Sequence, residues 1–238
     1  ERMLNLQPSA EGIANVWSSA GGATLLLGNA ANSAAALAHG SVGPHKVSHV
    51  ICVASSRNVR TLRGIMDAST AQVVYSCFTM ADMLHEGDEV RIADLEAHLA
   101  ALSHAMMECE ATQTCCLVHC DMGVNRSPTL VLAFLLQQGL TLRESYRLVL
   151  AARDCADPLP GYRHALKSYE ASLHDGQCSV EDGELFTLHC SELMKLAEDG
   201  GDGHPSGQDE DPSLAAFNKA MLLRTTAIES LIAEASDA

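Results

Sequence analysis

The sequence offers one clear place for chemistry, a cysteine and an arginine six residues apart in a glycine-containing loop. The run from Val118 to Thr129 reads V-H-C-D-M-G-V-N-R-S-P-T, with Cys120 and Arg126 on either side of Gly123. A short apolar segment precedes the loop and an apolar, helix-forming segment follows it. Such a loop lies at a helix N-terminus, where unsatisfied backbone amides and the helix dipole bind anions. The spacing therefore predicts a phosphate-binding loop with a thiol nucleophile at its base.

The residue types in this loop suit phosphoryl chemistry. The thiol of Cys120 should ionise readily, because a helix N-terminus and a guanidinium can lower a cysteine pKa from about 8.5 to roughly 3.5–7.5. Arg126 can hold two phosphoryl oxygens with its planar fork, which a lysine cannot do. Ser127 can donate a hydrogen bond to the departing sulfur, and His119 can brace the loop. The expected phosphate-binding residues are Asp121, Met122, Gly123, Val124, Asn125 and Arg126.

Each of these residues also has an ordinary structural interpretation. A cysteine is often a buried apolar side chain, and an arginine near a helix start is usually a solvated surface charge. The complete pattern His-Cys-x-x-Gly-x-x-Arg-Ser, however, arises by chance in only about one in ten thousand chains of this composition. The pattern therefore favours an active loop.

The rest of the sequence predicts an α/β fold that could position this loop. Short apolar strands alternate with helical segments, an order typical of a parallel sheet with helices on its faces. We expect a central, mostly parallel sheet of four to five strands flanked by helices, with an extra helical C-terminal extension. The predicted strands are residues 24–28, 47–54, 73–78 and 115–119. The first predicted helices are an alanine-rich segment after Asn29 and the apolar stripe at 92–106. They are followed by a helix from Pro128 to Gly139, a helix capped by Thr141 and Glu144 and closed by Arg153, and a final helix after Pro160.

Composition divides the chain into three parts. We expect residues 1–22 to be a lead-in, 23–173 to be the catalytic domain, and 174–238 to be an acidic helical tail with a mobile linker at 198–212. Of the formal net charge of −15, residues 171–238 contribute −11, from 14 acidic and 3 basic side chains. This charge argues against nucleic acids and anionic membranes as partners. The tail should either pack on the domain or make a partner or autoinhibitory contact.

The cysteines favour a reducing compartment. Nine is an odd number without a regular disulfide framework, and Cys120 must stay reduced to act as a nucleophile. No apolar run approaches the length of a membrane span. We therefore expect a cytoplasmic or nuclear protein that does not insert into a membrane.

The loop resembles that of the dual-specificity protein phosphatases, a compact group within the cysteine-dependent protein tyrosine phosphatase superfamily. Their loop typically reads His-Cys-x-x-Gly-x-x-Arg-Ser, and the similarity extends over residues 23–173, from the strand ending in Gly28-Asn29 to Tyr169-Glu170 in the last helix. The resemblance implies a phosphoprotein substrate. It implies hydrolysis of phosphotyrosine and of phosphoserine or phosphothreonine through a phosphocysteine intermediate, with no metal or other cofactor.

The same resemblance implies a general acid upstream of the nucleophile. A departing alkoxide or phenoxide needs a proton, and the family supplies it from an aspartate on a loop. Asp82 matches best, because it lies four residues after Phe78 and beyond the predicted strand. Asp88, in an acidic cluster nearby, is the alternative. The chosen aspartate would then serve as the base that activates water.

Two other functions remain open at this point. The loop could bind a phosphoprotein with little turnover, or it could act on a non-protein phosphate ester. Lipid and RNA phosphatases of the superfamily tend to carry basic residues in or around the loop. Asp121 and Met122 stand directly after Cys120 in this chain, which disfavours highly anionic esters.

Overall fold

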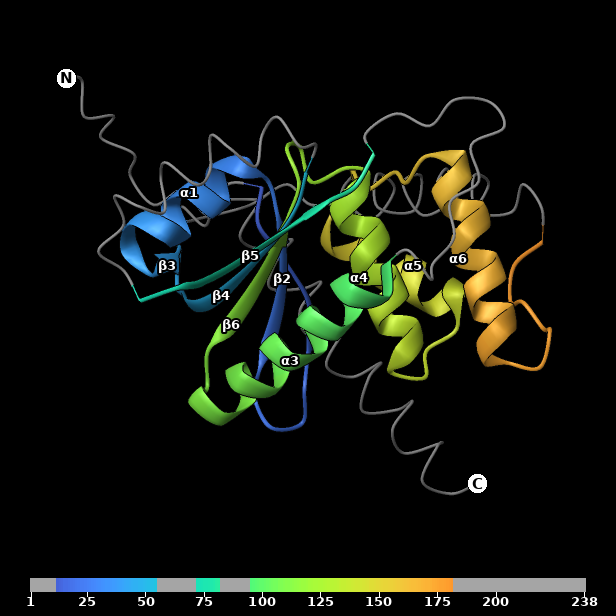
Figure 1. The fold of residues 1–238 in the computed structure, drawn as a ribbon, viewed down its shortest axis with the longest axis horizontal. Helices are drawn as coiled ribbons and strands as arrows, with labels where there is room; N and C mark the ends of the chain where they lie inside the picture. The colour runs from blue at the N-terminus through green and yellow to red at the C-terminus, as the bar shows by residue number, and fades with distance from the viewer. Residues whose placement is uncertain (1–11, 55–71, 82–94, 182–238) are drawn as a thin grey trace, which may run out of the picture.

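The computed structural model describes residues 12–54, 72–81 and 95–181, and these form a sheet with helices on both faces (Figure 1). This arrangement confirms the α/β class of fold. The predicted linker at 198–212 and the rest of the chain beyond residue 181 lie outside the described residues. The elements are β1 Ala14–Ser18, β2 Thr24–Gly28, α1 Ala30–His39, β3 Ser41–Val42, β4 His45–Ala54, β5 Val74–Thr79, α3 Glu96–Thr112, β6 Cys115–His119, α4 Arg126–Gln137, α5 Leu142–Ala152 and α6 Pro160–Leu173.

The sheet is mixed, which corrects the expectation of a mostly parallel sheet of four to five strands. Its order is β1-β2-β6-β4-β3, with β5 also paired to β4. The four predicted strands are β2, β4, β5 and β6, and they do run parallel. Two further strands, β1 and β3, run antiparallel to their neighbours. Sequence reasoning missed β1 because it assigned residues 1–22 to a lead-in, although Gly21-Gly22 between two apolar runs is a hairpin signal.

The two faces of the sheet are covered by different helices. Side chains alternate along each strand, so neighbouring residues point to opposite faces. Leu26, Val50 and Leu117 lie in a buried cluster with residues of α1, whereas Leu25 and Val118 lie in the larger cluster with residues of α3, α4, α5 and α6. Figure 1 shows α1 on one side of the sheet and α3 to α6 on the other. None of the described helices is long and apolar enough to span a bilayer.

The parallel strands bring their C-terminal ends to one edge of the sheet. β2, β4, β5 and β6 end at Gly28, Ala54, Thr79 and His119. The described residues that follow β2, β5 and β6 therefore lie at that edge, as in other open α/β sheets. The loop from Cys120 to Asn125 follows β6 directly and joins it to α4.

Helix α4 begins earlier than its sequence indicates. We predicted a start at Pro128, but the helix starts at Arg126, and Pro128 is its third residue. A proline is tolerated in the first turn because the backbone N–H there has no partner within the helix. The earlier start places Arg126 and Ser127 in the first turn, so the amides of that turn face the loop.

Helix α6 carries a buried carboxylate that holds three segments together. Glu170 is 1% exposed, and its carboxylate accepts hydrogen bonds from the amide of Leu142 at 2.7 Å, the amide of Ser179 at 2.9 Å and the thiol of Cys178 at 3.0 Å. Burial raises the pKa of Glu170, but these hydrogen bonds outweigh burial and the pKa is lowered. Val180 is also buried, so the first residues of the predicted tail pack on the domain.

We predict that Glu170→Gln destabilises the fold by about 1–3 kcal/mol, because an amide cannot accept all three hydrogen bonds. Denaturant unfolding at pH 7 measures the change, with Glu96→Gln, exposed at the start of α3, as the control. The contribution of ionised Glu170 is present above pH 4.5 and is lost as pH falls through its lower folded pKa. A difference from the parent that stays constant down to pH 3 would contradict this account.

Candidate active site

The sulfur of Cys120 lies at the centre of the loop and receives hydrogen bonds from two sides. The amide of Gly123 and the hydroxyl of Ser127 both donate to Sγ at 3.2 Å. Cys120 is only 2% exposed, and burial by itself raises its pKa. The hydrogen bonds from Ser127 and Gly123 and the charge of Arg126 outweigh burial, so the pKa of Cys120 is lowered. The arrangement therefore favours a thiolate.

Gly123 has no substitute at its position. Its φ of +70° lies in the left-handed region, which favours glycine. A Cβ at this position would meet the carbonyl oxygen of Gly28 at 2.5 Å and Nη2 of Arg153 at 2.8 Å. Glycine thus lets the loop fold tightly against the end of β2 while its amide reaches the sulfur.

Arg126 lies inside the loop and is paired with a residue of the loop itself. Its side chain is 2% exposed, and Nη2 donates to Oδ2 of Asp121 at 2.6 Å. The sequence predicted that Arg126 would face a phosphate and that Asp121 would contribute its backbone amide. The contact of the Asp121 carboxylate with the guanidinium was not predicted.

Arg153 holds the loop from its other side, a role that sequence analysis missed. Nε donates to the carbonyl of Gly123 at 2.7 Å, Nη2 donates to the carbonyl of Met122 at 2.8 Å, and Nη1 contacts the carbonyl of Gly12. These bonds draw the loop carbonyls toward Arg153 and away from the sulfur. The sequence identified Arg153 only as the residue that closes α5, because it lies about thirty positions from the loop.

Further hydrogen bonds fix the remainder of the loop. They tie it to the start of α1 and to the connection between α5 and α6. The contacts run from the amide of Ala30 to the carbonyl of Asp121 at 3.1 Å, from the amide of Asp157 to the carbonyl of Val124 at 2.7 Å, and from the amide of Leu159 to Oδ1 of Asn125 at 3.0 Å.

His119 contacts the backbone beside the nucleophile. Its Nδ1 lies 3.0 Å from the carbonyl oxygen of Cys120, so Nδ1 must carry the proton that it donates. The ring is buried, and burial lowers the pKa of His119 to about 4. His119 is therefore neutral at physiological pH and contacts the loop as a hydrogen-bond donor.

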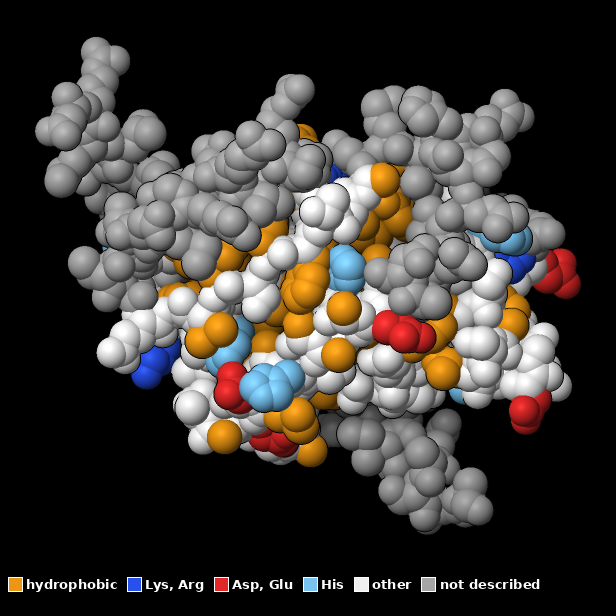
Figure 2. Space-filling model, viewed as in Figure 1, with side chains coloured by type: hydrophobic (Ala, Val, Ile, Leu, Met, Phe, Trp, Pro, Cys, Tyr) orange, Lys and Arg blue, Asp and Glu red, His pale blue; other side chains and the backbone are white. Residues whose placement is uncertain are grey.

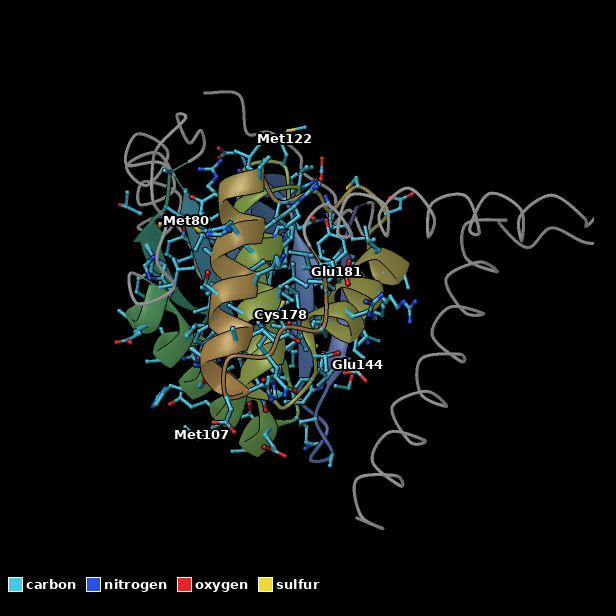
Figure 3. All side chains as sticks on the ribbon, turned by 90° about the vertical axis from the view of Figure 1, so that its right-hand side faces the viewer. Met80, Met107, Met122, Glu144, Cys178 and Glu181 are labelled. Carbon is cyan, nitrogen blue, oxygen red and sulfur yellow. The ribbon has the colours of Figure 1, made fainter. Side chains whose placement is uncertain are left out.

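Both candidate general acids, Asp82 and Asp88, lie outside the described residues. The two residues before Asp82, Met80 and Ala81, are among the described residues. The amide of Met80 donates to the carbonyl of Ala54 at 3.1 Å, and the hydroxyl of Tyr162 in α6 donates to the carbonyl of Ala81 at 2.5 Å. Figure 3 shows Met80 at the same end of the molecule as Met122 of the loop, with Met107 at the opposite end.

A second polar cluster lies at the opposite end of the strands. His49 contacts Glu108 at 2.6 Å through Nε2 and Ser48 at 2.9 Å through Nδ1, and Figure 2 shows histidine and acidic side chains together over that part of α3. The sequence of contacts, from Ser48 to His49 to Glu108, resembles a Ser-His-carboxylate triad. The hydroxyl of Ser48, however, also lies 2.6 Å from the hydroxyl of Thr114, and the neighbouring Cys109 is fully buried. We therefore interpret these side chains as a hydrogen-bond network that supports the fold. Among the residues described, no group of His, Cys, Asp and Glu side chains is arranged to hold a metal ion.

The family model and the known proteins that resemble this chain all belong to one family. The family model described as "Dual specificity phosphatase, catalytic domain" matches residues 33–172. Human dual specificity phosphatase 28 is 36% identical over 86 residues, which are 36% of this chain and 49% of that protein. Mouse dual specificity protein phosphatase 22 is 29% identical over 127 residues, 53% of this chain and 60% of that protein. The chain thus spans about half the length of these curated relatives.

Solved structures share the fold. The crystal structure of human DUSP28 matches 70% of this chain and 98% of its own, with 25% identity and a TM-score of 0.50. The crystal structure of PTPMT1 in complex with PI(5)P matches 68% of this chain and 97% of its own, with 20% identity and a TM-score of 0.51. At that identity the second structure shows a common fold alone.

We predict that Ser127→Ala raises the pKa of Cys120, because it removes a hydrogen bond that the thiolate accepts at 3.2 Å. The midpoint is measured from the pH dependence of Cys120 alkylation by iodoacetamide, followed by mass spectrometry. Ser172→Ala, in an exposed part of α6, is the matched control and should leave the midpoint in place. An unchanged midpoint in Ser127→Ala would contradict the role of this hydroxyl.

Proposed function

The chain belongs to the dual-specificity phosphatase family, and we propose that it hydrolyses phosphotyrosine, phosphoserine and phosphothreonine on proteins through a phosphocysteine intermediate. One observation carries the proposal. The sulfur of Cys120 accepts hydrogen bonds from Gly123 and Ser127 within a loop that also holds the buried guanidinium of Arg126. A nucleophile, an anion-binding loop and a fixed positive charge in one place are the parts that phosphoryl transfer needs.

In the first step, the thiolate of Cys120 attacks phosphorus in line with the leaving oxygen. The sulfur–phosphorus bond forms, the phosphorus–oxygen bond breaks, and the leaving oxygen takes a proton from the general acid. Arg126 and the loop amides hold the equatorial oxygens, whose charge spreads in the transition state. The phosphoryl group is then carried on Cys120.

In the second step, water attacks the phosphocysteine and the sulfur leaves. The general acid of the first step, now ionised, accepts the proton of the water. Ser127 donates a hydrogen bond to the departing sulfur, as it does to the resting thiolate, and so stabilises the leaving group. Inorganic phosphate and the free thiolate are the products.

Asp82 is our assignment for the general acid, with Asp88 as the alternative. Asp82 follows β5, whose end lies at the same edge of the sheet as the loop. It also follows Ala81, whose carbonyl is held by Tyr162. The assignment is thus supported by the position of Ala81, the last described residue before Asp82.

The residues of the loop also disfavour the two alternative functions, a phosphoprotein-binding module and a phosphatase for non-protein esters. A phosphoprotein-binding module has no need of a thiolate, which makes turnover the better reading of Cys120. A highly anionic, non-protein phosphate ester would meet the carboxylate of Asp121 and the exposed side chain of Met122, neither of which attracts it.

We also propose a compartment, a domain boundary and a role for the tail. A reducing compartment, cytoplasmic or nuclear, suits a protein whose cysteines are free thiols throughout the described residues. We propose that the catalytic domain comprises residues 23–173 together with β1, which pairs with β2. The tail at 174–238 packs on this domain at its start, where Val180 is buried, and a partner or autoinhibitory contact is proposed for the remainder.

We predict that the protein releases p-nitrophenolate from p-nitrophenyl phosphate with a burst of about one equivalent per site, because a covalent intermediate forms faster than it is hydrolysed. Rapid-mixing absorbance measures the burst. Cys120→Ser should show neither burst nor turnover, while Cys155→Ser, which changes an exposed thiol, should behave as the parent. Turnover by Cys120→Ser would exclude the covalent route, and phosphate binding without any turnover by the parent would favour the binding module.

We predict that Asp82→Asn lowers kcat on phosphotyrosine peptides by about 10²- to 10⁴-fold, the usual contribution of a general acid. Steady-state kinetics on a phosphotyrosine peptide and on p-nitrophenyl phosphate measure it, and the accompanying loss in kcat/KM, which reports the first step, should be smaller for the better leaving group. Asp88→Asn is the matched control. If Asp88→Asn shows the large, leaving-group-dependent loss instead, then Asp88 is the acid.

A further inference from the structure

Asp121 joins the first position of the loop to the arginine at its end. Oδ2 of Asp121 lies 2.6 Å from Nη2 of Arg126 and accepts a hydrogen bond from it. The backbone of Asp121 is fixed too, because its carbonyl accepts from the amide of Ala30 at 3.1 Å. The loop therefore carries an anion of its own within reach of the guanidinium that would bind phosphate.

The two partners differ in their exposure to solvent. The side chain of Arg126 is 2% exposed, whereas that of Asp121 is 34% exposed. A buried guanidinium without a negative partner is strongly unfavourable, so a carboxylate beside it stabilises the loop while no phosphate is bound. The carboxylate can also turn toward solvent and give up its position at the guanidinium.

A phosphate would use the same donor. Guanidinium groups bind phosphate through two parallel N–H donors, and Nη2 lies on one side of that fork. The Asp121 carboxylate occupies Nη2 in this structure. Nη2 has two N–H groups and the carboxylate takes one of them, so a phosphate bound at Nη2 would lie beside the carboxylate and compete with it for the positive charge of Arg126.

We infer that Asp121 competes with phosphate for Arg126 and so lowers the affinity of the loop for phosphate itself. The inference rests on the proposed phosphatase function and concerns regulation of the same site. When a phosphate dianion binds, the Asp121 carboxylate leaves Nη2 and then lies beside the dianion, which it repels. Removal of the carboxylate should therefore tighten the binding of phosphate.

An opposite role for Asp121 predicts the opposite sign. The ion pair could hold Arg126 in the orientation that catalysis needs. Loss of such a positioning contact would weaken phosphate binding and lower kcat. Loss of a competitor strengthens phosphate binding, and only this second role can tighten binding when the carboxylate is removed.

The test is the affinity for inorganic phosphate, measured by isothermal titration calorimetry at pH 7 in a Cys120→Ser background. Asp121→Asn keeps the size of the side chain and an oxygen that can accept from Arg126, so the loop retains its shape. We expect its phosphate Kd to fall about two- to fivefold, the effect of a partly exposed ion pair. Asp154→Asn, which removes the same charge from an exposed position next to Arg153, should leave Kd within twofold.

A second readout uses the same substitutions with Cys120 intact. The phosphate inhibition constant with p-nitrophenyl phosphate as substrate should fall in parallel in Asp121→Asn. A phosphate Kd that is unchanged or weaker in Asp121→Asn would overturn the inference. If the parent binds phosphate but turns nothing over, the proposed function fails, and a tighter Kd in Asp121→Asn still supports the competition at Arg126.

Discussion

The site depends on one constraint, that a negatively charged sulfur must be stable inside a nearly closed loop. Cys120 is 2% exposed, and burial alone raises its pKa. Hydrogen bonds from Gly123 and Ser127 reverse that effect, because each donor is aimed at the sulfur and cannot turn to water instead. The fold around the loop serves to keep these donors in place.

The donors are placed by contacts on the far side of the loop. A peptide group has its N–H and its C=O on opposite sides, so a residue that binds the carbonyls also directs the amides. Arg153 binds the carbonyls of Met122 and Gly123, and the amide of Asp157 binds that of Val124. The loop therefore requires α5 and the connection to α6 as much as it requires β6 and α4.

Two arginines act on one loop in different ways. Arg153 faces carbonyl oxygens and fixes the backbone, whereas Arg126 lies buried inside the loop, where its charge acts on Cys120. Asp121 modifies only the second of these, through its contact with Nη2. The carboxylate of Asp121 thus acts on the charge of Arg126, whereas it does not contact Arg153 in any hydrogen bond described above.

The sequence alone determined the parts that depend on local spacing. A cysteine and an arginine six residues apart, a glycine between them, four apolar strands and the cap of α5 by Thr141 and Glu144 all lie within short stretches, where periodicity and capping rules apply. Tertiary structure decided what depends on distant pairing. β1 is antiparallel because its partner is the next strand, Arg153 meets the loop because α5 packs beside it, and the backbone of Asp121 is held by the first residue of α1. Such contacts join residues that no local pattern relates, and only the folded chain brings them together.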